Sequence, residues 1–304
     1  MYSRVTRVPS LAIAIGGIAV LTAGCAVSGS TVSSSTVSGS TASHNSASGG
    51  PTTSASAASA TPQQAILLAS KTEQADKSFD ATISVQGTAS TGSISLDGTL
   101  QEQIHPSVLA EMDVSSFSAA GQAVSGGFAE IITQDAFYLK YPQLMKTEHI
   151  VEPWVEFKLS ELGSSGSTLQ SLFSQIQSSS PATQSAELAT SKNVRKVGTG
   201  VIDGVPVTEY AGSYSISQAL AALPASERSA LSSSISASGI SSCQFKMWVD
   251  GSNQPRKIVI TEDGTAVNET TTVNVISYNQ PVSVQLPTAA QTYVIPASQL
   301  GASS

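Results

Sequence analysis

The stretch Ala81–Thr88 reads ATISVQGT and decides the fold, because its side chains alternate between apolar and polar with a period of two. In an extended chain, Ala81, Ile83 and Val85 fall on one side, and the Thr, Ser and Gln between them fall on the other. This pattern predicts a β-strand with one buried face and one face in water.

Similar strands are expected on both sides of this stretch, separated by turn residues. Asp203-Gly204, Asp250-Gly251 and Asp263-Gly264 are hairpin turn signals, so consecutive strands should be antiparallel neighbours. Roughly ten strands result, and an open sheet of that size must curl or split. Besides residues 81–88, the expected strands are 94–100, 108–114, 128–132, 136–141, 154–159, 194–202, 205–216, 245–249, 257–261 and 270–278.

Helices are expected before the first strand and in two later interruptions. Thr61 can cap a helix that begins at Pro62 and ends before Phe79. Apolar residues at helical spacing predict further helices over 169–176, from Pro181 to Leu188, and over 217–235. The fold class predicted is therefore α+β.

The N-terminus carries the features of an exported lipoprotein. Arg4 and Arg7 precede an apolar run from Leu11 to Leu21, and small residues lead to Cys25. We interpret residues 1–24 as a signal peptide and Cys25 as the acylated first residue of the mature chain. The alternative is an ordinary secretory signal that is cleaved near Ala23.

The remaining sequence divides by composition. Residues 25–61 consist mainly of Ser, Thr, Ala and Gly, as expected of a disordered tether behind the lipidated cysteine. Residues 62–296 are long enough for one domain with a sizeable core, and residues 297–304 are expected to be a flexible tail. The expected location is the extracytoplasmic face of the cell membrane, reached through the lipid anchor.

The charge excludes one class of partner. The formal net charge is −7, and removal of Arg4 and Arg7 with the signal leaves 12 basic and 21 acidic residues, a net −9. An acidic chain is a poor ligand for nucleic acid, and it gains little from anionic lipid head groups. Membrane residence should therefore depend on the acyl anchor.

Catalytic motifs are missing from the sequence. The three histidines, His44, His105 and His149, form no His-Glu-x-x-His pattern, and no Gly-x-Ser-x-Gly occurs. We predict no enzyme activity, no catalytic residue, no metal site and no cofactor. With Cys25 assigned to the anchor, Cys243 is expected to be a small buried side chain outside any disulfide.

Three charged residues, Glu130, Glu156 and Lys158, are expected on strand faces opposite the apolar set, in contact with solvent.

Several motifs together resemble one family. Residues 247–260, MWVDGSNQPRKIVI, resemble the W-V-D…L-P-R-K hairpin of the actinobacterial LppX/LprG lipoproteins, with Gln254 where that family usually has Leu. Residues 201–212, VIDGVPVTEYAG, are similar to the family's D-G-x-P-x-x-x-Y-x-G strand pair. Residues 137–140, 153–159 and 280–287 are similar to its central strands and exit. The resemblance covers the chain from about Pro62 to Pro296.

The resemblance implies a half-barrel related to the LolA and RseB-type domains. A strongly curved antiparallel sheet would carry helices over its concave face and enclose an apolar cavity for acylated lipid. The candidate cavity residues are Ile83, Val85, Leu96, Met112, Phe137, Leu139, Phe157, Leu172, Phe173, Leu220, Met247 and Ile260.

Two functions follow from this resemblance. The first is binding of an acylated lipid or glycolipid, for transport or presentation across the envelope, with an envelope transporter as a possible partner. The alternative is a regulatory or protein-interaction module of the RseB type, which binds a polypeptide or senses the state of the envelope.

Overall fold

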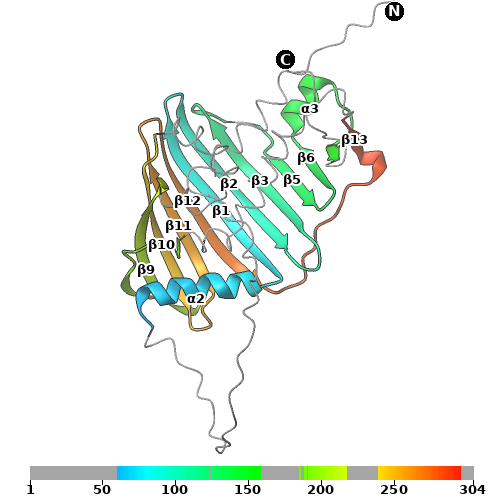
Figure 1. Cartoon of the computed structure of the whole chain (residues 1–304). Coiled ribbons are helices and arrows are strands. Elements are labelled where there is room, and N and C mark those ends of the chain that lie inside the picture. Colours follow the sequence, from blue (N-terminus) through cyan, green and yellow to red (C-terminus); the bar gives the residue numbers. More distant parts are fainter. Residues whose placement is uncertain are drawn as a thin grey trace, which may run out of the picture.

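A computed structural model describes residues 60–123, 125–158, 185, 188–189, 191–217 and 239–295. Most of the described chain forms one open, curved sheet of 13 strands (Figure 1). The predicted signal peptide, Cys25, the predicted tether up to residue 59, the predicted tail and most residues of the later predicted helices lie outside the described residues. None of the described helices is long and apolar enough to span a membrane.

Every expected strand is present, and the number of described strands exceeds the expected ten. They are β1 (Ser78–Ala89), β2 (Gly92–Gln103), β3 (Leu109–Ala119), β4 (Gln122–Ala123), β5 (Phe128–Thr133), β6 (Ala136–Lys140), β7 (Trp154–Lys158), β8 (Arg195–Ile202), β9 (Val205–Ser215), β10 (Ser242–Asp250), β11 (Pro255–Asp263), β12 (Val267–Tyr278) and β13 (Thr292–Val294).

The order across the sheet is β13-β7-β6-β5-β3-β2-β1-β12-β11-β10-β9-β8, with β4 beside β3. The strands are antiparallel neighbours, except that β13 runs parallel to β7. The hairpins at Asp203-Gly204, Asp250-Gly251 and Asp263-Gly264 are formed as predicted. Pairing of β1 with β12 joins the early and late parts of the chain at the centre of the sheet.

Helix α2 (Pro62–Ala75) begins as its sequence predicts. The Thr61 hydroxyl accepts a hydrogen bond from the Gln64 backbone N–H, and the Gln64 side chain accepts one from the Thr61 N–H. This capping box, with Pro62 in the first turn, satisfies backbone donors that a helix start leaves open. The buried residues Ala65, Ile66 and Ala69 pack on one face of the sheet.

We call the face against which α2 packs the inner face. It carries Phe79, Ala81, Ile83 and Val85 of β1, together with their direct cross-strand neighbours, because paired residues in a ladder share a face. Three buried apolar clusters follow one another along it.

The α2-side cluster lies on β9, β10 and β11 beneath α2, and the central cluster lies on β1, β2, β3, β5 and β12. The α3-side cluster lies on β3, β5, β6 and β7, with Leu144 and Met145 of α3 (Pro142–Glu148) packed against it.

Four elements were missing from the sequence prediction: the two-residue strand β4, the short helix α3, the 3-10 turn η4 (Ala289–Gln291) and the three-residue strand β13. Each is short, so none shows a full hydrophobic period. Pro142 at the start of α3 is the signal that the sequence offered.

Candidate functional site

Nine of the twelve predicted cavity residues lie on the inner face. Ile83, Val85 and Leu96 belong to the central cluster, with Met112 packed against it. Phe137, Leu139 and Phe157 belong to the α3-side cluster, and Met247 and Ile260 to the α2-side cluster. The other three, Leu172, Phe173 and Leu220, lie outside the described residues.

Eight of these nine side chains are buried, and Met112 is partly buried. Val85, Phe157 and Met247 have no exposed surface, and Leu139 is 1 % exposed. The pairing of the strands places these side chains on one face of the sheet, from β7 to β10. This face extends across all three apolar clusters. Whether they line a cavity stays a prediction.

A cavity of about 810 Å³ opens at the α2 end of the inner face. Ala65, Tyr210 and Val249 line it and also belong to the α2-side cluster. Other residues make the rest of the lining polar, among them Lys196 of β8 and Arg256 of β11. This volume is within the usual range of small-molecule sites.

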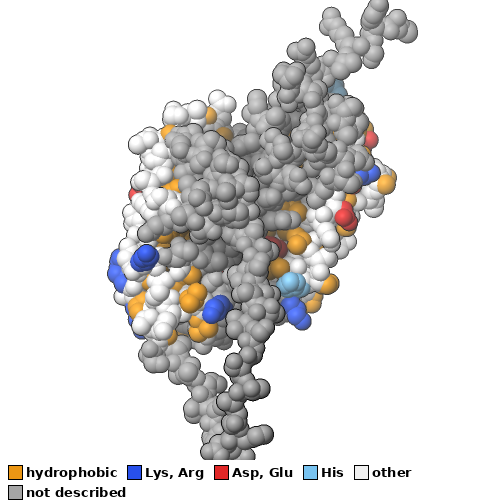
Figure 2. All heavy atoms as spheres, in the orientation of Figure 1, with side chains coloured by type: hydrophobic (Ala, Val, Ile, Leu, Met, Phe, Trp, Pro, Cys, Tyr) orange, Lys and Arg blue, Asp and Glu red, His pale blue; other side chains and the backbone are white. Residues whose placement is uncertain are grey.

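The cavity is therefore amphipathic, with one wall continuous with the buried apolar face and another that carries Lys196 and the Asp250–Arg256 ion pair. Figure 2 shows apolar and basic side chains together at this end of the molecule. Sequence reasoning did not identify this cavity, because its polar lining comes from a hairpin turn and an edge strand that adjoin only in the fold.

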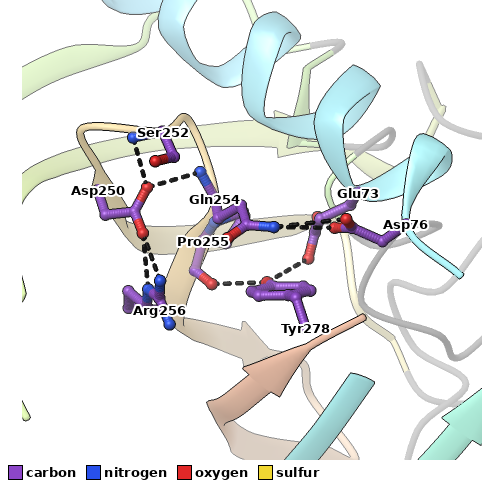
Figure 3. Close-up of polar contacts among 8 residues, drawn as sticks. All are labelled: Glu73, Asp76, Asp250, Ser252, Gln254, Pro255, Arg256 and Tyr278. Carbon is purple, nitrogen blue, oxygen red and sulfur yellow. Dashed lines mark hydrogen bonds and ion pairs between the residues drawn. The ribbon is translucent and has the colours of Figure 1, made fainter. Parts of the chain in front are cut away.

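A polar network beside the cavity holds the β10–β11 hairpin (Figure 3). One carboxylate oxygen of Asp250 accepts the backbone N–H groups of Ser252 and Gln254, at 2.8 and 3.0 Å. The other accepts the Arg256 guanidinium, with Nε and Nη2 both 2.7 Å away. Asp250 and Arg256 of the W-V-D…P-R-K motif therefore have a structural role in this chain.

The same network joins this hairpin to the end of α2. The Gln254 amide nitrogen lies 3.4 Å from Asp76 Oδ1, a contact that the Leu usual in the resembled family could not make. Asn279 also donates to Asp76. These contacts fix the end of the helix to β11 and to the end of β12.

Glu73 of α2 lies deep in this region. The Tyr278 hydroxyl is 2.6 Å from the Pro255 carbonyl oxygen and 3.1 Å from Glu73 Oε1. Burial raises the pKa of Glu73 to about 8, so the carboxyl is largely protonated at neutral pH. A protonated Glu73 satisfies the geometry well, because a single hydroxyl hydrogen cannot serve two acceptors fully.

The prediction that Glu130 contacts solvent is wrong. It pairs with Met112 on β3 and with Leu139 on β6, so its side chain lies on the inner face and is 3 % exposed. Its Oε2 has no hydrogen-bond partner, and burial raises its pKa to about 7. Glu156 and Lys158 do lie opposite Phe157, and both are partly buried.

Two further carboxyl groups, Glu269 of β12 and Glu262 of β11, lie next to each other on the inner face. They pair directly across the two strands, and they are 5 % and 8 % exposed. Burial, followed by the charge of Glu262, raises the pKa of Glu269 to about 8. In the described part of the chain, no group of three or more His, Cys, Asp or Glu side chains could hold a metal ion.

Cys243 has no exposed surface, as predicted for a small core side chain. It is disulfide-bonded, however, so the expectation that it stands outside any disulfide is wrong.

Comparison with known proteins finds likeness in structure. No protein-family model matches the chain, and no curated protein sequence matches it. Among solved structures, LprF from Mycobacterium bovis is 13% identical, with a TM-score of 0.47, over 74% of this chain and 96% of that one. The lipoprotein LppX of Mycobacterium tuberculosis is 18% identical, with a TM-score of 0.40, over 74% and 98%.

A complex of MucA and MucB from Pseudomonas aeruginosa also matches, at 10% identity and a TM-score of 0.34, over 77% of this chain and 63% of that one. A LolA superfamily protein from Nitrosomonas europaea matches at 9% identity and a TM-score of 0.29, over 75% of this chain and 96% of that one.

Proposed function

We propose that this chain is a non-enzymatic lipoprotein of the cell envelope that binds an acylated lipid against the inner face of its sheet. In this proposal the domain is residues 62–296, helices cover the concave side of a half-barrel, and the twelve candidate residues line the space for the acyl chains. The lipid's polar end lies in the cavity beside α2.

The amphipathic cavity is the observation that supports this function best. Its Ala65, Tyr210 and Val249 wall is continuous with the apolar inner face, whereas Lys196 and Arg256 lie at its polar side. An amphiphile has the same division, with chains that avoid water and a head group that forms hydrogen bonds. Arg256 is paired with Asp250, which also lines the cavity, so Lys196 supplies the positive charge that favours an anionic or hydroxyl-rich head group.

The energy of the acyl chain explains why such a site is useful. Moving a sixteen-carbon chain from a bilayer into water costs on the order of 10 kcal/mol, at about 0.8 kcal/mol per methylene. A protein that covers the chain removes most of that cost, and a flexible tether of about 36 residues would hold the protein near its membrane, with an r.m.s. reach of about 30–35 Å.

Lipid analysis by mass spectrometry tests the site. The full chain is purified from its native host, its bound lipid is extracted, and the amount per protein is compared with that of Thr208→Trp. Thr208 lines the cavity, so the bulky side chain should reduce bound lipid at least fivefold. Glu209→Trp is the matched control, because Glu209 pairs with Trp248 on the opposite face and should keep its lipid.

The outcomes separate the alternatives. Wild-type protein without lipid contradicts the proposal, and a co-purifying envelope polypeptide without lipid would favour the RseB-type function. Equal lipid in folded Thr208→Trp and Glu209→Trp proteins would contradict the assignment of the cavity.

Acylation of Cys25 is a separate part of the proposal. Cys25 is the only other cysteine of the sequence, so a disulfide of Cys243 within one chain and acylation of the Cys25 sulfur exclude each other. Mass spectrometry of the mature N-terminal peptide decides: a peptide that begins at Cys25 and carries acyl mass supports the anchor. A disulfide-linked peptide that contains Cys25 contradicts it.

A further inference from the structure

The two edges of the sheet differ in length and exposure. At one edge, β13 has three residues, and such short edge strands resist unwanted pairing. At the other edge, next to β9 in Figure 1, β8 has eight residues and is exposed or partly exposed throughout. Within the described ranges, no strand pairs with the outer side of β8.

Two apolar side chains stand out on this edge. Val197 is 50 % exposed and Val201 is 67 % exposed. Thr199 lies midway between them in the sequence. An unpaired strand of this length with exposed valines is a template for another strand.

The turn after β8 determines which backbone groups point outward. Asp203 and Gly204 have φ of 47° and 80°, as a type I′ turn requires, and Ile202 pairs with Val205 across it. The residues that flank such a turn exchange hydrogen bonds, and the direction alternates along the strand. The N–H and C=O groups of Thr199 and Val201 therefore point to the open edge.

We propose that β8 pairs with β8 of a second copy of this chain, antiparallel and about a two-fold axis at Thr199. In this register Val197 lies opposite the second copy's Val201, and Arg195 lies opposite its Asp203. Each pair occurs twice, because a two-fold interface uses the same surface on both copies. The segment from Arg195 to Asp203 thus places valine opposite valine and arginine opposite aspartate in each half of the interface.

Space along the strand allows this approach. Gly198 lies opposite the second copy's Gly200, and no heavy atom lies within 4 Å of the Cβ position at either glycine. The β8–β9 ladder has a bulge between Lys196 and Gly198, so Val197 is the extra residue of the bulge and the regular ladder runs from Gly198 to Ile202. Arg195 lies beyond the bulge and reaches Asp203 through its long side chain.

A disulfide cross-link tests the register. In the full chain, Thr199→Cys places two thiols opposite each other on the proposed axis, and mild oxidation should produce a Cys-to-Cys peptide between two copies. Ile276→Cys is the matched control, because Ile276 is 61 % exposed but lies on β12, away from the edges. The position-199 variant should cross-link at least tenfold faster.

Charge reversal tests the pairing independently by sedimentation equilibrium. Arg195→Glu should weaken the dimer about tenfold, since like charges then face each other twice. Adding Asp203→Lys should restore the wild-type dimer, and circular dichroism verifies that each variant is folded. A wild-type chain that stays monomeric at submillimolar concentration, or equal cross-linking at positions 199 and 276, would overturn the proposal.

Discussion

The two ends of the inner face hold buried carboxyl groups in different ways. At the α2 end, Glu73 contacts the Tyr278 hydroxyl, and Asp250 binds Arg256 and two backbone N–H groups. Glu73 Oε2 has no partner, and neither has Glu130 Oε2 at the α3 end, where Glu130 pairs across the strands with the apolar residues Met112 and Leu139. The first arrangement fixes a helix to the sheet, whereas the second places an ionisable group where packing alone would prefer an apolar one.

This difference has a thermodynamic meaning. A buried charge with a good partner contributes little net stability but is costly to break, whereas a buried group without a partner lowers stability while it is present. Substitutions at the two ends should therefore change the free energy of unfolding in opposite directions.

The largest effect should come from Asp250→Ala, which leaves Arg256 and two backbone donors without their acceptor. We expect a loss of about 3 kcal/mol in the free energy of unfolding, measured by urea denaturation. Asp263→Ala is the matched control, because Asp263 is exposed at another Asp-Gly turn and should change stability by less than about 0.5 kcal/mol. Equal losses would contradict the role of the Asp250 network.

The pH dependence of stability should be the next largest effect. Burial raises the pKa of Glu130 to about 7, and that of Glu73 and of Glu269 to about 8, from an ordinary value of 4.5. The folded state therefore holds more protons than the unfolded state between these values. Stability is greatest below about pH 4.5 for these groups and falls as pH rises to about 8.

Each such carboxyl should contribute a slope of about 1.4 kcal/mol per pH unit within its own window. Thermal melts between pH 5 and 8 measure the trend. A melting temperature that rises over this range would show that these carboxyls are not buried in their protonated form.

Glu130→Leu should stabilise the domain at pH 8 by about 2 kcal/mol, because it removes a buried group that lacks a partner and keeps a similar volume. It should also flatten the pH dependence between about pH 4.5 and 7. Glu156→Leu, at a partly buried position on the other face, should do neither. A destabilised Glu130→Leu protein would indicate a partner for this carboxyl.

Tyr278→Phe tests the other end with the opposite sign. Removal of the hydroxyl leaves the Pro255 carbonyl and Glu73 without this donor, so we expect a loss of about 1 kcal/mol. Tyr293→Phe is a suitable control, and denaturation curves compare the two. Equal free energies of unfolding for Tyr278→Phe and Tyr293→Phe would show that the contacts of the Tyr278 hydroxyl with Pro255 and Glu73 add no stability.

The smallest effect should come from Gln254→Leu. The Gln254 amide lies 3.4 and 3.5 Å from the two oxygens of Asp76, which is long for a hydrogen bond. We expect a loss of no more than about 0.5 kcal/mol. A loss above 1 kcal/mol would mean that this residue, where the chain departs from the resembled family, matters more than its geometry indicates.

The sequence predicted the strands correctly where one face of the strand is exposed to solvent. The alternation in Ala81–Thr88 and the Asp203-Gly204 turn predicted their strand and hairpin correctly, because each signal is local. Thr61 and Pro62 likewise predicted the start of α2. The buried position of Glu73 also had a signal, since it lies seven residues after Ile66 and four after Ala69, on the packed side of the helix.

Glu130 shows where local reasoning fails. Five of the six residues of β5 are buried, so the strand has no wet face from which to read an alternation. Its face is set by pairing with Met112 and Leu139, which are distant in sequence. The cavity could not be predicted either, because Ala65, Lys196 and Arg256 meet only after the sheet forms.

Photo-cross-linking with a phospholipid that carries a diazirine on its acyl chain tests the central claim most directly. After irradiation of the full chain, mass spectrometry locates the labelled residues. The account predicts labels on inner-face positions such as Val85, Leu139 and Met247. Labels confined to outer-face positions such as Ile276, or no labelling above that of a denatured control, would contradict it.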